Sequence, residues 1–335
     1  MGLRFVLFAS LLLTCRAKSI SWPFYTYNNQ SMFLDATIGT PGQFVRLWLS
    51  DNVLNNDDDG VNDDLKVSDA RNGGIFNPDN STSFVKTGNV YNYFGLEKIG
   101  IKGTETFKLG NGDVEVTKPL KVLNEKSYYF NEEHGQVSFG RSKNSASFIE
   151  SILSDLDEKV VVFSFDDVDD DMSGVLTLGA RPTDRCANDW ILVPEHVFDE
   201  QSWQQWAVEI DSLSIGKYSF GSPGQSVIDI YGSTILVPQS YYGQILRALQ
   251  AGSLGEIDCD IQVDIVFTVE KQEIRIPPDD YVDRSLMSTF GQCYANIDPH
   301  FISTAFYLPN SILKRHCLLY DYAGISVGFA TRIQQ

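Results

Sequence analysis

The chain has 335 residues, of which 43% are hydrophobic and 12% aromatic. This length and composition exclude an intrinsically disordered chain and suffice for two lobes with separate cores. The formal net charge of −18 gives a surface that repels nucleic acid and anionic membranes, so we expect neither as a partner. The same charge suits an acidic compartment, or it serves solubility alone.

Residues 1–17 have the pattern of a secretory signal peptide. Arg4 gives a basic start, residues 5–13 are apolar, and Ala17 is a small residue for cleavage. The apolar run is too short to span a bilayer, and we predict no membrane span later in the chain. We therefore expect a secreted, extracellular protein, with the lysosomal lumen as the alternative. Sequons at Asn29 and Asn80 predict glycosylation on surface loops.

From residue 31 onward the chain consists mainly of short β-rich runs bounded by Gly, Asn, Asp or Pro. In chain order they cover residues 31–39, 44–49, 83–94, 115–123, 158–165, 174–180, 205–216, 226–237, 259–269 and 324–331. Residues 145–156 and 238–252 have helical spacing or helix start and stop residues. One sheet of so many strands is implausible, so the sequence predicts a mainly β fold with two packed lobes and a few short helices.

Two acidic loops, residues 55–64 and 166–174, interrupt this pattern. The first has spacings similar to a calcium-binding loop, but Lys66 stands where the bidentate Glu is expected and no helices flank it. We interpret both as solvated loops and predict no metal and no cofactor. The four histidines lack ligand spacing and a Ser or Cys partner motif, so metal, serine and cysteine hydrolase mechanisms find no support. They are His134, His196, His300 and His316.

Four cysteines remain after the signal peptide: Cys186, Cys259, Cys293 and Cys317. An even number in an oxidising compartment predicts two disulfides, and the residues alone leave three pairings open.

Two apolar strands that run into a polar turn, residues 44–52 and 226–238, occur one in each half of the chain. Five motifs, taken in order, then resemble the pepsin-like aspartic protease family over almost the whole mature chain. They are IGTPGQ (38–43), GIKGTETFKLG (100–110), GVLTLGARPTDRC (174–186), SVIDIYGSTILVP (226–238) and FYLPNSILKRHCLLYDYAGISVGFA (306–330). The resemblance implies a bilobal monomer, with an N-terminal lobe at 18–180 and a C-terminal lobe at 181–335. It also implies the pairs Cys259–Cys293 and Cys186–Cys317.

The family's chemistry needs two carboxylates that share one proton, each carried by an Asp-Thr-Gly turn. Aligned on the opening motif, the first position is Ser50, and the turn becomes Ser-Asp-Asn. Asp51 is a substitute only after a one-residue shift, which turns it to the other face of the strand. The second turn keeps Asp229, but Tyr231 replaces its glycine.

The substrate-binding residues implied by the resemblance are Tyr93 in the flap, and Tyr231, Gly232 and Ser233 in the second turn. Phe94 and Leu96 replace flap glycines, and an ordinary half-buried strand tyrosine is the alternative for Tyr93. The family's basic prosegment is also not found, which fits either a protein without activity to restrain or a truncated gene model.

Three functions remain open at this point. The first is a catalytically inactive pepsin-like protein that binds a peptide or protein segment in its cleft. The second is an active acid endopeptidase that uses Asp229 and Asp51. The third is a secreted structural or storage protein. We favour the first, because it explains the altered turns, the altered flap and the missing prosegment together.

Overall fold

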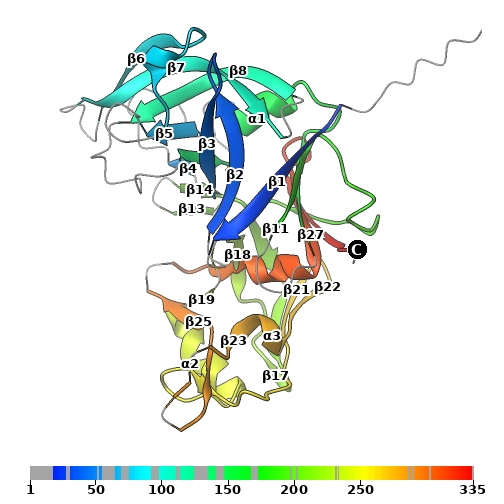
Figure 1. Ribbon diagram of the computed structural model, residues 1–335. Helices are drawn as coiled ribbons and strands as arrows, with labels where there is room; N and C mark the ends of the chain where they lie inside the picture. Colours follow the sequence, from blue (N-terminus) through cyan, green and yellow to red (C-terminus); the bar gives the residue numbers. More distant parts are fainter. Residues whose placement is uncertain are drawn as a thin grey trace, which may run out of the picture.

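The computed structural model shows the expected bilobal, mainly β fold (Figure 1). It describes residues 18–27, 31–50, 53–54, 65–68, 75–91, 98–110, 114–123, 135–140, 147–166, 173–196, 198–200, 203–230, 232, 234–285, 287–288, 290–301 and 303–333. No helix in this part of the chain is long and apolar enough to cross a bilayer.

The strands of the first half, in chain order, are β1 (Ile20–Tyr27), β2 (Ser31–Ile38), β3 (Gln43–Ser50), β4 (Val53–Leu54), β5 (Leu65–Ser68), β6 (Val85–Tyr91), β7 (Lys98–Leu109), β8 (Val114–Leu123), β9 (Gly135–Ser138), β10 (Val160–Phe165) and β11 (Ser173–Leu178). Those of the second half are β12 (Ile191–Pro194), β13 (Phe198–Glu200), β14 (Trp203–Gln205), β15 (Ala207–Ile210), β16 (Ser212–Ile215), β17 (Tyr218–Ser219), β18 (Gly224–Ile228), β19 (Ile235–Pro238), β20 (Glu256–Ile257), β21 (Ile265–Val269), β22 (Gln272–Ile276), β23 (Val282–Asp283), β24 (Cys293–Ala295), β25 (Ile297–His300), β26 (Phe306–Leu308), β27 (His316–Asp321) and β28 (Ser326–Thr331).

Both predicted helices are present. Helix α1 (Phe148–Leu153) begins at a capping box, in which the Ser147 hydroxyl accepts from the Glu150 N–H and the Glu150 carboxylate accepts from the Ser147 N–H. Helix α2 (Gln239–Ala248) follows Pro238 and ends at Leu249. Short helical turns that were not predicted lie at α3 (Pro278–Tyr281), η2 (Pro78–Asn80) and η3 (Asn310–Lys314).

The predicted strand over 259–269 is shorter in the structure. Only β21, from Ile265 onward, is a strand. The Asp258 side chain accepts a hydrogen bond from the Asp260 N–H at 2.9 Å. Local side-chain bonds of this kind favour a turn over an extended strand, and they explain why β pairing begins later.

The two halves share one sheet. Strands β12, β28 and β27 of the second half continue directly into β10, β11 and β1 of the first half. The junction is the antiparallel pair β10–β27, in which Val160 lies opposite Asp321 and Phe163 opposite Leu318. All six residues of β10 are buried, as expected for a central strand covered on both faces.

An aromatic cluster packs at this junction. The Trp206 ring stacks on Tyr320, with ring centroids 4.9 Å apart and an angle of 8° between the planes. The Trp206 indole N–H donates to the Phe139 carbonyl at 2.8 Å, and the Tyr322 hydroxyl donates to the same carbonyl at 2.5 Å. Two buried donors from the second half therefore hold one backbone oxygen of the first half, which fixes the halves against each other.

Each half contains the same four-strand arrangement. In the first half, β3 runs parallel to β9, β9 antiparallel to β5, and β5 parallel to β8. In the second half, β18 runs parallel to β26, β26 antiparallel to β19, and β19 parallel to β25. The turn after β3 and the turn after β18 are therefore structural counterparts.

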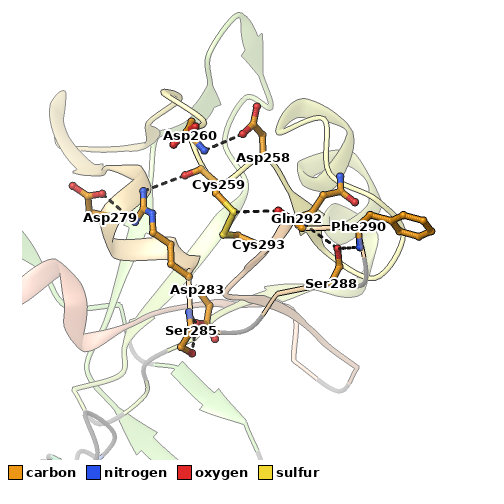
Figure 2. The surroundings of a disulfide bond; sticks show 12 residues. Asp258, Cys259, Asp260, Asp279, Asp283, Ser285, Ser288, Phe290, Gln292 and Cys293 are labelled. Carbon is orange, nitrogen blue, oxygen red and sulfur yellow. Dashed lines mark hydrogen bonds and ion pairs between the residues drawn. A yellow bond between two sulfur atoms is a disulfide. The ribbon is translucent and has the colours of Figure 1, made fainter.

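Both disulfides have the pairing that the family resemblance implies. Cys186 bonds to Cys317, which ties the segment between the halves to β27. Cys259 bonds to Cys293 on β24 within the second half, and Figure 2 shows the Asp258 and Asp260 turn on one side of it and the loop that carries Ser288 and Phe290 on the other.

Candidate functional site

Asp229 directly follows β18 and is half-buried. Its backbone N–H donates to the Leu308 carbonyl at 2.9 Å, which extends the β18–β26 pairing by one residue. Its carboxylate oxygen Oδ1 accepts the Gly232 N–H at 2.9 Å. The carboxylate is therefore held by a backbone donor of its own turn, as expected for a group whose orientation matters.

A side chain at position 232 would collide with the Asp229 carboxylate. A Cβ atom there would lie 2.2 Å from Asp229 Oδ2 and 2.7 Å from its Cγ. The Gly232 carbonyl in turn accepts the Asn310 N–H at 2.8 Å, so the turn is bonded to the segment that follows β26. The sequence pattern predicts the supporting glycine two residues after the aspartate, but the structure uses the glycine three residues after it.

Strand register identifies the counterpart of Asp229 in the first half. Gln136 on β9 pairs with both Trp48 and Lys66, and Tyr307 on β26 pairs with both Val227 and Leu236. Ser50 lies two residues beyond Trp48, as Asp229 lies two residues beyond Val227. The backbone of Ser50 thus takes the position that Asp229 takes in the second half.

The same register bears on Asp51. Counted from β3, its position corresponds to Ile230, which is fully buried in the hydrophobic core of the second half. The register of β3 therefore favours Ser50 over Asp51 as the counterpart of the second aspartate.

The face of the sheet that carries Asp229 includes residues that sequence reasoning missed. Tyr307 lies opposite Val227, and its ring stacks on His300 with centroids 5.2 Å apart. His300 Nδ1 accepts the Ser303 N–H at 2.7 Å. The parallel register of β18 and β26 brings Tyr307 beside the aspartate strand, and the closing motif that contains Tyr307 did not indicate this position.

Several predicted site residues lie outside the described residues: Asp51, Tyr93, Tyr231, Ser233 and Asn29. The same holds for residues 1–17, for the acidic loop 55–64 and for 167–172 of the second acidic loop. Asn80 is described, and it is exposed at the end of η2.

Comparison with known proteins decides the family. The family model described as eukaryotic aspartyl protease matches residues 35–332. The chain belongs to this family. Similar proteins include Aspartic protease 17 of Caenorhabditis elegans, 24% identical over 94% of this chain and 86% of the relative. Gastricsin of Oryctolagus cuniculus is 24% identical over 93% of this chain and 84% of the relative.

A eukaryotic aspartyl protease of the pepsin-like kind binds peptide substrates in its cleft. The two counterpart turns follow β3 and β18. In this member one turn keeps an aspartate with its backbone donor, and the other has a serine at the corresponding position. Asn310 is buried, and its backbone N–H is bonded to the second turn.

Proposed function

We propose that this member of the aspartyl protease family binds an extended peptide or protein segment in its cleft and does not cleave it. The observation that supports the proposal is the strand register, in which Ser50 pairs with Ser138 and follows Trp48 by two residues, as Asp229 follows Val227. A serine hydroxyl cannot share the proton that two carboxylates share. One carboxylate cannot act as base toward water and as acid toward the scissile carbonyl at the same time. Losing a catalytic group commonly costs several powers of ten in rate, at about 1.4 kcal/mol each.

One observation favours a second candidate, an active acid endopeptidase. The Asp229 turn remains shaped around its carboxylate, with the Gly232 N–H bond in place. In this alternative Asp51 supplies the second carboxylate. The counterpart of Asp51 is a core position, and this speaks against the alternative.

Digestion of an acid-denatured protein substrate separates the two candidates. The purified mature chain is incubated from strongly acidic to neutral pH beside Asp229→Asn. We expect no cleavage above the level of that variant, together with measurable binding of unstructured peptides by both proteins. Cleavage that is absent in Asp229→Asn would establish the active enzyme instead.

We further propose that the protein is secreted as a glycosylated monomer. The signal-peptide pattern, the two disulfides and the exposed Asn80 sequon support this. Expression in a secreting eukaryotic cell should deliver the chain to the medium. A glycosidase-sensitive mass difference between wild type and Asn80→Gln checks the modification, and equal masses would exclude it.

A further inference from the structure

The five-stranded sheet of the second half has two unlike faces. Its strands lie in the order β15, β18, β26, β19 and β25, and Figure 1 shows β19 and β25 side by side in the second lobe. One face is buried in the main hydrophobic core, to which it contributes Val208, Ile228, Phe306, Val237 and Ile297. The other face is the one on which Asp229 lies, directly after β18, and we call it the Asp229 face.

The residues of the Asp229 face follow from the strand pairing, because side chains alternate between the two faces of a sheet. They are Ala207, Glu209, Gln225, Val227, Asp229, Leu236, Asp298, His300 and Tyr307. Ala207 and Val227 are buried in a small cluster of their own, and the rest are half-buried or exposed. The Asp229 face is therefore open to solvent on both sides of β18.

All the acidic and basic side chains of the Asp229 face, histidine apart, are acidic. None of the five strands contains Lys or Arg. Glu209 on β15 and Asp298 on β25 are exposed, and they lie on the two edge strands of the sheet. Neither carboxylate has an ion pair or a hydrogen bond with a residue that the structure describes. Charge complementarity therefore favours a cationic ligand on this face.

An aromatic pair lies beside Asp298. The rings of His300 and Tyr307 stack with centroids 5.2 Å apart and an angle of 19° between the planes. The Ser303 N–H donates to His300 Nδ1 at 2.7 Å, which orients the imidazole and leaves the proton of the neutral ring on Nε2. Flat rings of this kind pack against the aliphatic stem of Lys or the guanidinium of Arg. The surface next to Asp298 therefore suits a long basic side chain.

The first half has the opposite charge at the counterpart position. Strands β5 and β8 of the first half correspond to β19 and β25 of the second. Lys121 pairs with Lys66 at the place where Asp298 pairs with Leu236. The acid at position 298 is therefore particular to the second half, and this is where we expect the basic part of a ligand.

We propose that the Asp229 face selects a peptide segment with basic side chains, which Glu209 and Asp298 recognise. Strands β15 and β25 are four strand spacings apart, about 19 Å at about 4.8 Å each. An extended peptide advances about 3.3 Å per residue, so two basic side chains about six residues apart would reach both carboxylates. The inference rests on the proposed peptide-binding function and names the class of segment that is bound.

Four short fluorescent peptides test the preference. Three share one unstructured sequence and hold two Lys, two Gln or two Glu at positions about six residues apart. The fourth holds the two Lys next to each other, so its charge equals that of the first. Binding is measured by fluorescence anisotropy at neutral pH and about 0.15 M salt. Wild type should bind the spaced Lys peptide about tenfold more tightly than the Gln peptide and about threefold more tightly than the adjacent Lys peptide.

Variants of the protein locate the preference. Asp298→Asn and Glu209→Gln should each lower the preference for Lys over Gln about threefold. Asp155→Asn is the matched control, because it removes an exposed acid of the first half, and it should leave the preference unchanged since distant charges are screened at this salt concentration. Asp298→Lys should turn the preference toward the Glu peptide, and loss of folding cannot produce such a reversal.

The outcomes separate this inference from the proposed function. Equal binding of the spaced Lys and Gln peptides by wild type would overturn the inference and leave peptide binding intact. An equal effect of Asp298→Asn and Asp155→Asn would also overturn it, because net charge alone would then explain the preference. Binding of none of the four peptides would overturn the inference and the proposed function together.

Discussion

Replacing Gly232 with alanine tests how the second turn holds its carboxylate. The added Cβ would lie 2.2 Å from Asp229 Oδ2, well inside van der Waals contact, so the carboxylate must move away from the Gly232 N–H. Gly232 does not have a positive φ, so alanine meets no backbone strain there. The cost therefore comes from the carboxylate alone.

The magnitude follows from two contributions. Overpacking in a well-packed site costs about 1–3 kcal/mol. A hydrogen bond to a charged group contributes about 1.5–3 kcal/mol, and rotation of the half-buried carboxylate toward solvent recovers part of it. We expect Gly232→Ala to lower the free energy of unfolding by about 2–4 kcal/mol. Urea unfolding at neutral pH, followed by both fluorescence and circular dichroism, measures it.

Two comparisons make the test specific. Gly243→Ala, in helix α2 where nothing lies within 4 Å of the added Cβ, should stabilise the protein by about 0.5–1 kcal/mol. In an Asp229→Ala background the cost of Gly232→Ala should fall below about 1 kcal/mol, because the clashing carboxylate is gone. An equal cost in both backgrounds would refute the assignment of Gly232 as the residue that accommodates Asp229.

Three further predictions concern stability. Burial, followed by the charge of the neighbouring Arg315, holds the pKa of His316 below its ordinary value. The contribution of this histidine to stability is therefore present above about pH 6.5 and is lost as the pH falls through the lower folded pKa. His316→Gln should make the urea midpoint less sensitive to pH between about 7 and 5, and an unchanged sensitivity would contradict this. Ile325 is β-branched, has a φ of 51° and is 44% exposed. Replacing it by Asn should raise the free energy of unfolding by about 0.5–1 kcal/mol, whereas a loss of stability would show that the turn carries no strain. The two disulfides close loops of different length, with sequence separations of 131 for Cys186–Cys317 and 34 for Cys259–Cys293. From chain entropy, removing the first should lower the free energy of unfolding by up to about 5 kcal/mol, and removing the second by up to about 4 kcal/mol. Thermal unfolding should therefore show the larger loss of stability for the variant without Cys186–Cys317.

Much of the fold could be predicted because local signals and motif order agree. The helical spacing of residues 145–156 and the Pro and Gly at the ends of residues 238–252 predicted α1 and α2. The opening motif fixes the distance to Ser50, and the register of β3 against β9 sets this residue opposite Ser138. The resemblance to the pepsin-like family implied the disulfide pairing that the structure has.

What the sequence could not provide depends on contacts between distant segments. Strand β4 has two residues, too short for any periodicity, and it exists only because β14 pairs with it. The role of Gly232 could not be predicted without the path of the turn, because Tyr231 occupies the place where the pattern expects a glycine. The position of Tyr307 beside the Asp229 strand could not be predicted without the β18–β26 register, which joins segments far apart in the chain.

The junction of β10 with β27 has a consequence for biosynthesis. The first half of the chain leaves the ribosome with one edge of β10 open, since the partner strand consists of residues 316–321, close to the end of the chain. The Phe139 carbonyl likewise forms its hydrogen bonds with Trp206 and Tyr322 only after these residues have been made. An open, apolar strand edge is prone to pair with other chains. The first half therefore completes the shared sheet only after residues 316–321 have been made, and a chain that stops before residue 316 would leave both halves incomplete.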